Sequence, residues 1–204
     1  MKNAPNEGLS AEGIDEFADA YFKAYNDAVS AIDRNALAAA ARILWNAFIG
    51  DRFVFVCGNG GSAGISNHFT CDFIKRQNTK HPLRSRIVSL ASGTETMTMI
   101  SNDYGYEEVF RYQLQSLARP GEVLVTISSS GNSENIVRAI EWAKENGLST
   151  IALTGFSGGR SAALADVNIH VASNNYGTVE DAHQSVMHLL SQYLHRASVK
   201  GEGA

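Results

Sequence analysis

The sequence predicts a single α/β domain built on a doubly wound, parallel, five-stranded sheet that follows a pair of helices. Short apolar runs alternate with helix-like segments through most of the chain, a pattern typical of a parallel sheet with helices on both faces. The chain has 204 residues, a length that suits one domain with a substantial core. No internal repeat or low-complexity linker divides it, so we expect one domain over residues 1–204.

The first segment, about residues 10–50, is predicted to form two amphipathic helices. Apolar residues of the first helix follow a three-and-four spacing, and Ser10 is a plausible cap. Asp33 is in the position of a cap for the second helix, whose apolar face includes Leu37 and Leu44. Such a helical pair either supplies an oligomer interface or packs on its own domain.

The α/β core is expected at about residues 52–198. The predicted strands are residues 53–57, 86–90, 122–127, 149–153 and 167–171, and the main predicted helices are residues 62–75, 133–146 and 179–196. Right-handed crossovers bring the loops after successive parallel strands to one edge of the sheet, where ligands of such folds bind. We expect a loose tail after about Ser198.

Composition excludes several classes of function. The net charge of −4 argues against a general nucleic-acid binder, although a local nest of backbone N–H groups can still bind a small anion. No apolar stretch approaches the ~20 residues that a membrane helix needs. The N-terminal segment lacks the pattern of a secretory signal, so we expect a cytoplasmic protein. Cys57 and Cys71 give no disulfide framework, and Cys57 is expected to be a buried thiol.

A glycine-rich loop, Gly58-Asn59-Gly60-Gly61-Ser62-Ala63-Gly64, directly follows the first predicted strand. Its glycines let the backbone approach a ligand closely, and Ser62 opens a helix whose free N–H groups favour anions. A dinucleotide fingerprint would need an acidic residue after the next strand, and a P-loop would need Gly-Lys-Ser/Thr. Neither is present, so no nucleotide cofactor is expected. A purely structural tight turn is the plainer alternative.

A serine-rich loop, Ser128-Ser129-Ser130-Gly131-Asn132-Ser133, directly follows the third predicted strand. Its four hydroxyls and the next helix N-terminus form a compact set of donors for a phosphate group. Neutral donors with a helix dipole avoid burying a fixed cation when the site is empty. The alternative is a turn that merely caps the helix.

Together these motifs resemble the sugar isomerase (SIS) domain family, and within it the phosphoheptose isomerases. The resemblance also includes His68-Phe69, Asn102-Asp103, residues 151–155 and residues 165–167 in the same order. It implies a three-layer αβα sandwich and the interconversion of sedoheptulose 7-phosphate with D-glycero-D-manno-heptose 7-phosphate. It further implies a homotetramer whose active sites are shared between subunits. The implied substrate-binding residues are Asn59, Gly60, Gly61, Ser62, Asn102, Asp103, Ser128, Ser129, Ser130, Ser133 and Glu180.

Catalytic residues also follow from the resemblance. The family places a glutamate four residues after the first histidine, and here Asp72 has that position after His68. The spacing places both side chains on one helical face. His188 matches the catalytic histidine of the last helix. Isomerisation moves a proton between neighbouring carbons, so we expect Asp72 to act as base at carbon and His188 as acid and base at oxygen. A surface ion pair and an interface histidine are the plainer alternatives.

Some members of the family bind zinc through two histidines, the carboxylate and a glutamine. The matching set here is His68, Asp72, Glu180 and His188, and such nitrogen and oxygen ligands suit zinc. However, Glu180 and His188 lie about 12 Å apart along one continuous helix. They meet at one ion only if the helix starts later or if they come from different subunits. His183 is a spare ligand.

Asp72 and Glu180 both depart from the family pattern, which has glutamate and glutamine there. These departures leave open a five- or six-carbon sugar phosphate as substrate. They also leave open a non-catalytic SIS protein that binds a partner, as the bacterial replication-initiator-associating protein does. That protein lacks the second histidine of the last helix. The presence of His188 favours an enzyme.

Overall fold

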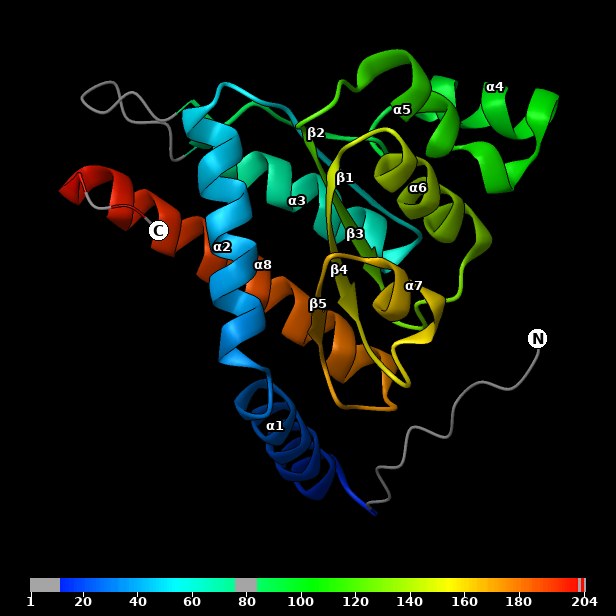
Figure 1. Cartoon of the computed structure of the whole chain (residues 1–204). Helices are drawn as coiled ribbons and strands as arrows, with labels where there is room; N and C mark the ends of the chain where they lie inside the picture. Colours follow the sequence, from blue (N-terminus) through cyan, green and yellow to red (C-terminus); the bar gives the residue numbers. More distant parts are fainter. Residues whose placement is uncertain (1–11, 76–83, 202, 204) are drawn as a thin grey trace.

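The computed structural model describes residues 12–75, 84–201 and 203. Figure 1 shows a central sheet with helices on both sides. All five strands are parallel, in the order β2-β1-β3-β4-β5. Their bounds are β1 Val54–Gly58, β2 Ile87–Ser89, β3 Val123–Ser128, β4 Ser149–Thr154 and β5 Val167–His170. The predicted doubly wound α/β fold is therefore confirmed, with every strand close to its predicted position.

The direction in which the chain winds reverses between β1 and β3. β1 pairs with β2 on one side and with β3 on the other. Gly58, the last residue of β1, is in register with Ile127 near the end of β3. The loops that follow these two strands therefore leave the sheet side by side, at the switch point where open α/β sheets bind ligands.

Two hydrophobic clusters cover the two faces of the sheet, because alternate residues of each strand point to opposite sides. On one face, Val54 and Val56 pack with Phe69 and Met187. On the other, Phe55 and Cys57 pack with residues such as Ile140. The first face is covered by α2 (Arg34–Ile49), α3 (Gly61–Lys75) and α8 (Tyr176–Lys200), and the second by α4 (Thr94–Tyr104), the 3-10 turn η1 (Tyr106–Glu108), α5 (Arg111–Leu117), α6 (Glu134–Glu145) and α7 (Gly159–Leu164).

The first helix, α1 (Ile14–Ser30), packs against α8. Figure 1 shows that it lies away from the sheet. The Tyr21 hydroxyl donates to Asp181 over 2.6 Å, and Tyr25 bonds Ser185 over 2.6 Å. Burial and the Asp181 carboxylate raise the pKa of Tyr21 to about 12. Part of the helical pair thus packs on its own domain.

Helix ends explain several boundaries. The predicted cap Asp33 is confirmed, because its side chain accepts from the Asn35 N–H. The predicted cap Ser10 lies outside the described residues, and Gly13 precedes α1 instead. Helix α8 begins at Tyr176, earlier than predicted, because Asn175 caps it. It continues to Lys200, so helix replaces the first part of the expected tail. Within the described ranges, no helix has the length and apolar character needed to cross a bilayer.

Candidate active site

A cleft opens at the carboxyl ends of β1 and β3, between the glycine-rich loop and the serine-rich loop. It encloses about 150 Å³, and α8 closes one side. Its lining contains seven of the eleven predicted substrate-binding residues, namely Asn59, Ser62, Ser128, Ser129, Ser130, Ser133 and Glu180. Ile127 and Tyr176, which were not predicted, complete the lining. The two motifs, separated by about seventy residues of sequence, therefore form one site.

The serine-rich loop is folded so that hydroxyls remain available. Gly131 has φ +64°, and a Cβ there would lie 1.9 Å from the Gly158 carbonyl oxygen, so only glycine fits. Ser133 is the N-cap residue of α6, yet its side chain makes no capping bond. The buried Ser129 hydroxyl has no hydrogen-bond partner within the described part of the chain. This geometry favours ligand binding over the capping alternative, since an unpaired buried hydroxyl is costly.

Two helix N-termini converge on the same cleft. Helix α3 begins at Gly61, beside the lining residue Ser62, and α6 begins immediately after Ser133. The free N–H groups and positive dipole ends of such helices favour an anion. The lining includes neither lysine nor arginine among the described residues. The cleft therefore suits a phosphate group bound by neutral donors.

The Asn59 side chain is fixed by neighbours from two other elements. Its amide exchanges a pair of 2.9 Å hydrogen bonds with the buried Asn135, and its oxygen also accepts from the Tyr106 hydroxyl at 2.8 Å. Asn59 consequently holds the loop in place and has little hydrogen-bonding capacity left for a ligand. Sequence reasoning missed Asn135, Tyr106 and the lining residue Tyr176. The one available signal was Asn135, a polar residue on the apolar face of its helix.

Glu180 packs its carboxylate against the start of α3. A Cβ on Gly61 would lie 2.3 Å from the Glu180 Oε2 atom, so a larger residue there would displace this carboxylate. Burial and the neighbouring Asp181 raise the pKa of Glu180. Gly60 has φ +54° in the same turn. Both predicted glycines thus shape the cleft through their backbone.

A second group of polar side chains lies farther along α3 and α8. His68 Nε2 is 3.5 Å from Asp72 Oδ1, and His188 Nε2 is 3.7 Å from Asp72 Oδ2. Asp72 is buried, whereas His68 is exposed and His188 is half-buried. The two imidazole rings meet edge to face with centroids 5.0 Å apart. Asp72 and His188 are therefore adjacent, as their predicted roles require.

These three residues also form a potential metal site. One ligand atom from each of His68, Asp72 and His188 lies within 4.8 Å of the others. Glu180, the fourth residue of the expected zinc set, is not in this group. It belongs to the same continuous helix as His188 but eight residues earlier, about 12 Å along the axis. Gln184 lies between them instead, and its amide nitrogen is 2.8 Å from His68 Nδ1 and 3.4 Å from His188 Nε2.

The remaining predicted residues lie elsewhere. Asn102 and Asp103 are exposed near the end of α4, bonded to each other over 2.8 Å, and do not line the cleft. Their role in substrate binding stays a prediction. His183 is fully buried and outside the potential metal group. Burial lowers the pKa of His183 to about 4, and the nearby His170 acts in the same direction while the Thr154 backbone opposes it.

Comparisons with known proteins show the family to which the chain belongs. The model of the SIS domain family matches residues 20–155. A phosphoheptose isomerase of Shewanella sp. (strain W3-18-1) is 38% identical over 173 residues, which cover 83% of this chain and 87% of the relative. The chain belongs to the SIS domain family and, within it, to the phosphoheptose isomerases.

Solved structures of phosphoheptose isomerases agree with the fold. The enzyme of Neisseria gonorrhoeae superimposes with a TM-score of 0.80 at 31% identity, covering 89% of this chain and 96% of that one. The enzyme of Francisella tularensis gives a TM-score of 0.81 at 28% identity, covering 90% and 96%. The expected SIS fold and family are therefore confirmed, while the individual site residues rest on the geometry above.

Proposed function

We propose that this phosphoheptose isomerase converts sedoheptulose 7-phosphate to D-glycero-D-manno-heptose 7-phosphate through an enediolate. The observation that carries the proposal is the cleft of serine hydroxyls and two helix N-termini, which suits a phosphate dianion. The adjacent carboxylate and imidazole of Asp72 and His188 supply the proton-transferring groups that an aldose–ketose isomerisation needs.

In the proposed mechanism, Ser128, Ser129, Ser130 and Ser133 hold the phosphate, and the carbonyl end of the sugar reaches Asp72. Asp72 removes the proton from one carbon and returns it to the neighbouring carbon. His188 moves the proton between the two oxygens and assists ring opening. Aspartate is one methylene shorter than the family's glutamate, and a displacement of 1 Å can cost about 100-fold in rate. Burial of Asp72 under His68 and His188 supports a fixed position for this shorter side chain.

The side chains of His68, Asp72 and His188 suit a zinc ion. Zinc takes nitrogen and carboxylate ligands at about 2.0–2.2 Å, and Asp72 faces both imidazoles, with Oδ1 3.5 Å from His68 Nε2 and Oδ2 3.7 Å from His188 Nε2. We propose His68, Asp72 and His188 as its ligands, with Glu180 of another subunit as the fourth ligand that the family pattern suggests. Bound zinc would polarise the carbonyl oxygen.

We further propose a homo-oligomer, a tetramer by family resemblance, with the active site shared between subunits. Along the two helices, Glu180 is about 12 Å from His188 and Ser62 is about 15 Å from Asp72. An extended seven-carbon sugar phosphate, with C–C bonds of about 1.5 Å, spans only on the order of 10 Å. A partner subunit that brings its own Asp72 and His188 to the cleft would remove this difference.

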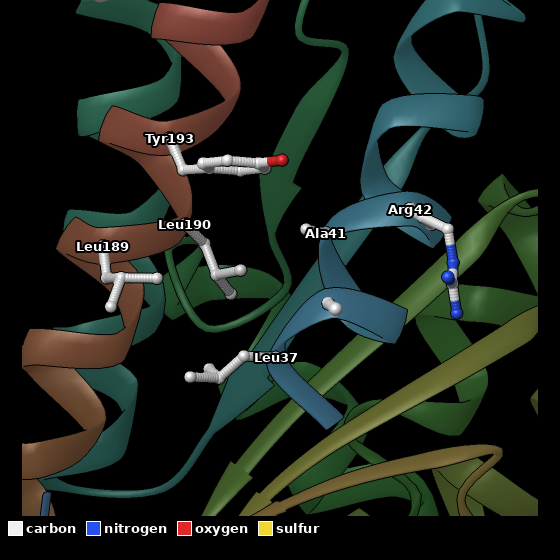
Figure 2. A pocket seen from close by; sticks show the side chains of 7 residues that line it. Leu37, Ala41, Arg42, Leu189, Leu190 and Tyr193 are labelled. Atoms are coloured by element: carbon white, nitrogen blue, oxygen red, sulfur yellow. The ribbon is translucent and has the colours of Figure 1, made fainter. Parts of the chain in front are cut away.

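An apolar groove between α2 and α8 supports assembly with a second copy. It encloses about 350 Å³ and is lined by Leu37, Ala38, Ala41, Arg42, Leu189, Leu190 and Tyr193. Figure 2 shows Leu190 and Tyr193 of α8 facing Ala41 of α2 across it. Leu189 and Tyr193 are each 47% exposed and lie one helical turn apart, which suits an isologous interface.

We also propose that the protein is cytoplasmic. The thiols of Cys57 and Cys71 are both free, as is usual for proteins of a reducing compartment.

The reaction is tested by incubating the protein with sedoheptulose 7-phosphate in deuterated water. Deuterium at C2 of an aldoheptose 7-phosphate is the expected result. Turnover of only a five- or six-carbon ketose phosphate would change the substrate, and no turnover of any of them would favour a non-catalytic binding protein. Asp72→Asn should abolish exchange while sugar-phosphate binding persists, whereas Cys71→Ser, exposed on the same helix, should have no effect. Normal exchange by Asp72→Asn would show that Asp72 is not the base.

Sharing of sites is tested by mixing two inactive variants during refolding. Ser133→Asp repels phosphate yet retains a good helix cap, and Asp72→Asn lacks the base. If each site combines two subunits, a 1:1 mixture recovers about a quarter of wild-type activity, since one combination in four is intact in a symmetric interface. Activity no greater than that of the separate variants would place both halves of the site in one subunit.

A further inference from the structure

The carboxamide of Gln184 lies between the two imidazoles of the second group. Gln184 is one helical turn before His188 on α8 and reaches across to His68 on α3. Its terminal nitrogen is 2.8 Å from His68 Nδ1 and 3.4 Å from His188 Nε2. The expected catalytic and metal-binding sets include both histidines but not this glutamine.

The two nitrogens of His68 have different partners. Nδ1 contacts Gln184 at 2.8 Å, and Nε2 faces Asp72 Oδ1 at 3.5 Å. In a neutral imidazole one nitrogen carries the proton and the other carries a lone pair. The partner of Nδ1 therefore decides whether Nε2 presents a proton or a lone pair to Asp72.

A glutamine can serve either state of this ring. With its NH2 group toward Nδ1, it donates, and His68 carries its proton on Nε2, directed at Asp72. After a half-turn of the carboxamide, the oxygen accepts from Nδ1–H, and the Nε2 lone pair faces the site. The turn exchanges the positions of the amide oxygen and nitrogen and keeps the shape of the side chain. The oxygen then also faces His188 Nε2, which lies 3.4 Å from the amide nitrogen before the turn.

We propose that Gln184 is a positioning residue that sets the tautomer of His68. Turning its carboxamide switches His68 Nε2 from a proton donor toward Asp72 to a ligand for a divalent cation. Metal-bound histidines usually donate their second N–H to a carbonyl or carboxylate, and here Gln184 supplies that acceptor. The inference rests on the proposed function in one respect, namely that His68 and Asp72 belong to the active site.

Geometry favours Gln184 over Glu180 for this task. Gln184 already contacts both imidazoles, whereas the Glu180 carboxylate lies against Gly61 at the start of α3. His68 is exposed, with 46% of its side chain accessible, so water can partly replace a lost partner. Loss of a supporting contact to a metal-bound histidine typically weakens metal binding by about 10- to 100-fold, and we expect a loss within this range when Gln184 is removed.

The experiment uses the full chain with three substitutions. Gln184→Glu offers only acceptor oxygens, and Gln184→Leu offers no hydrogen bond. Gln192→Leu, exposed two turns later on the same helix, is the matched control. Long-range 1H–15N spectra report the His68 tautomer without metal at about pH 8, where an ordinary histidine is neutral. Competition with a chromophoric chelator measures the zinc dissociation constant.

We expect Gln184→Glu to fix the Nδ1–H tautomer without metal and to bind zinc at least as tightly as wild type. Gln184→Leu should raise the zinc dissociation constant about 10- to 100-fold, and Gln192→Leu should match wild type. The same tautomer in wild type and both Gln184 variants would overturn the inference. Unchanged zinc affinity in Gln184→Leu, or no zinc binding by wild type, would overturn the part of the inference that concerns cation binding.

These outcomes are separate from the proposed isomerisation, because the spectra need no turnover. A tautomer that responds to Gln184 in a protein without isomerase activity would refute the proposed function alone. Normal isomerisation with a tautomer indifferent to Gln184 would refute this inference alone.

Discussion

Lowering the pH from 7 to 5 should destabilise the protein through a single buried histidine. His183 is fully buried on α8, and its pKa in the folded protein is about 4. Neither ring nitrogen makes a well-formed hydrogen bond within the described residues. In the unfolded chain its pKa returns to about 6.5. The unfolded state therefore binds more protons between these two values, so the free energy of unfolding falls as the pH falls through that window.

The magnitude follows from the two pKa values. Linkage gives a loss of about 2 kcal/mol between pH 7 and pH 5, and about 3 kcal/mol over the whole window. Urea unfolding at a series of pH values measures it. His183→Leu should lose this part of the pH dependence and remain as stable as wild type at pH 7, because it removes unsatisfied buried nitrogens. His195→Leu, on the same helix, is the control. A pH profile of His183→Leu parallel to that of wild type would refute the reasoning.

Three further predictions concern the cleft and the assembly. Gly131→Ala should destabilise the fold by more than about 2 kcal/mol, since a Cβ there meets the Gly158 oxygen at 1.9 Å. The control is Gly64→Ala in α3, where a Cβ meets open space, and it should stabilise the fold by about 0.5–1 kcal/mol. Equal changes in the free energy of unfolding of the two variants, measured with urea, would contradict this prediction. Tyr106→Phe removes the hydrogen bond to Asn59 and should weaken sugar-phosphate binding about 5-fold, which corresponds to about 1 kcal/mol. Wild-type affinity of this variant in titration calorimetry would show that the hydrogen bond does not contribute to ligand binding. Tyr193→Asp should dissociate the proposed oligomer in sedimentation experiments, whereas Gln192→Leu should not. An assembly that Tyr193→Asp leaves unchanged would show that the groove is not part of the subunit interface.

The strands were predictable because each is a compact apolar run that needs burial on both faces. Residues 53–57 and 149–153, for example, match β1 and β4 almost residue for residue. Helix α7 was not predicted, since its six residues are too few to show a helical period. Its start also depends on Gly158 in a left-handed conformation, with φ +82°, which no local pattern specifies.

The position of the candidate site was predictable, because the order of strands and helices determines where the two loops meet. Parallel strands place the two loops at one edge, so a shared cleft followed from the order of strands and helices. Contacts between distant side chains did not follow. Asn59 and Asn135 are 76 positions apart, and His68 and Gln184 are 116 apart. Only the packing of helices on the sheet brings such pairs together.

Helix α8 runs unbroken from Tyr176 to Lys200. Its first turns line the cleft between the glycine-rich and serine-rich loops, its middle carries Gln184 and His188, and its later turns line the apolar groove. One helix thus connects the cleft, the histidine pair and the surface of the proposed subunit interface. In the proposed oligomer, specific activity should consequently depend on protein concentration, because dilution would separate the subunits and free the helix that positions the reacting groups.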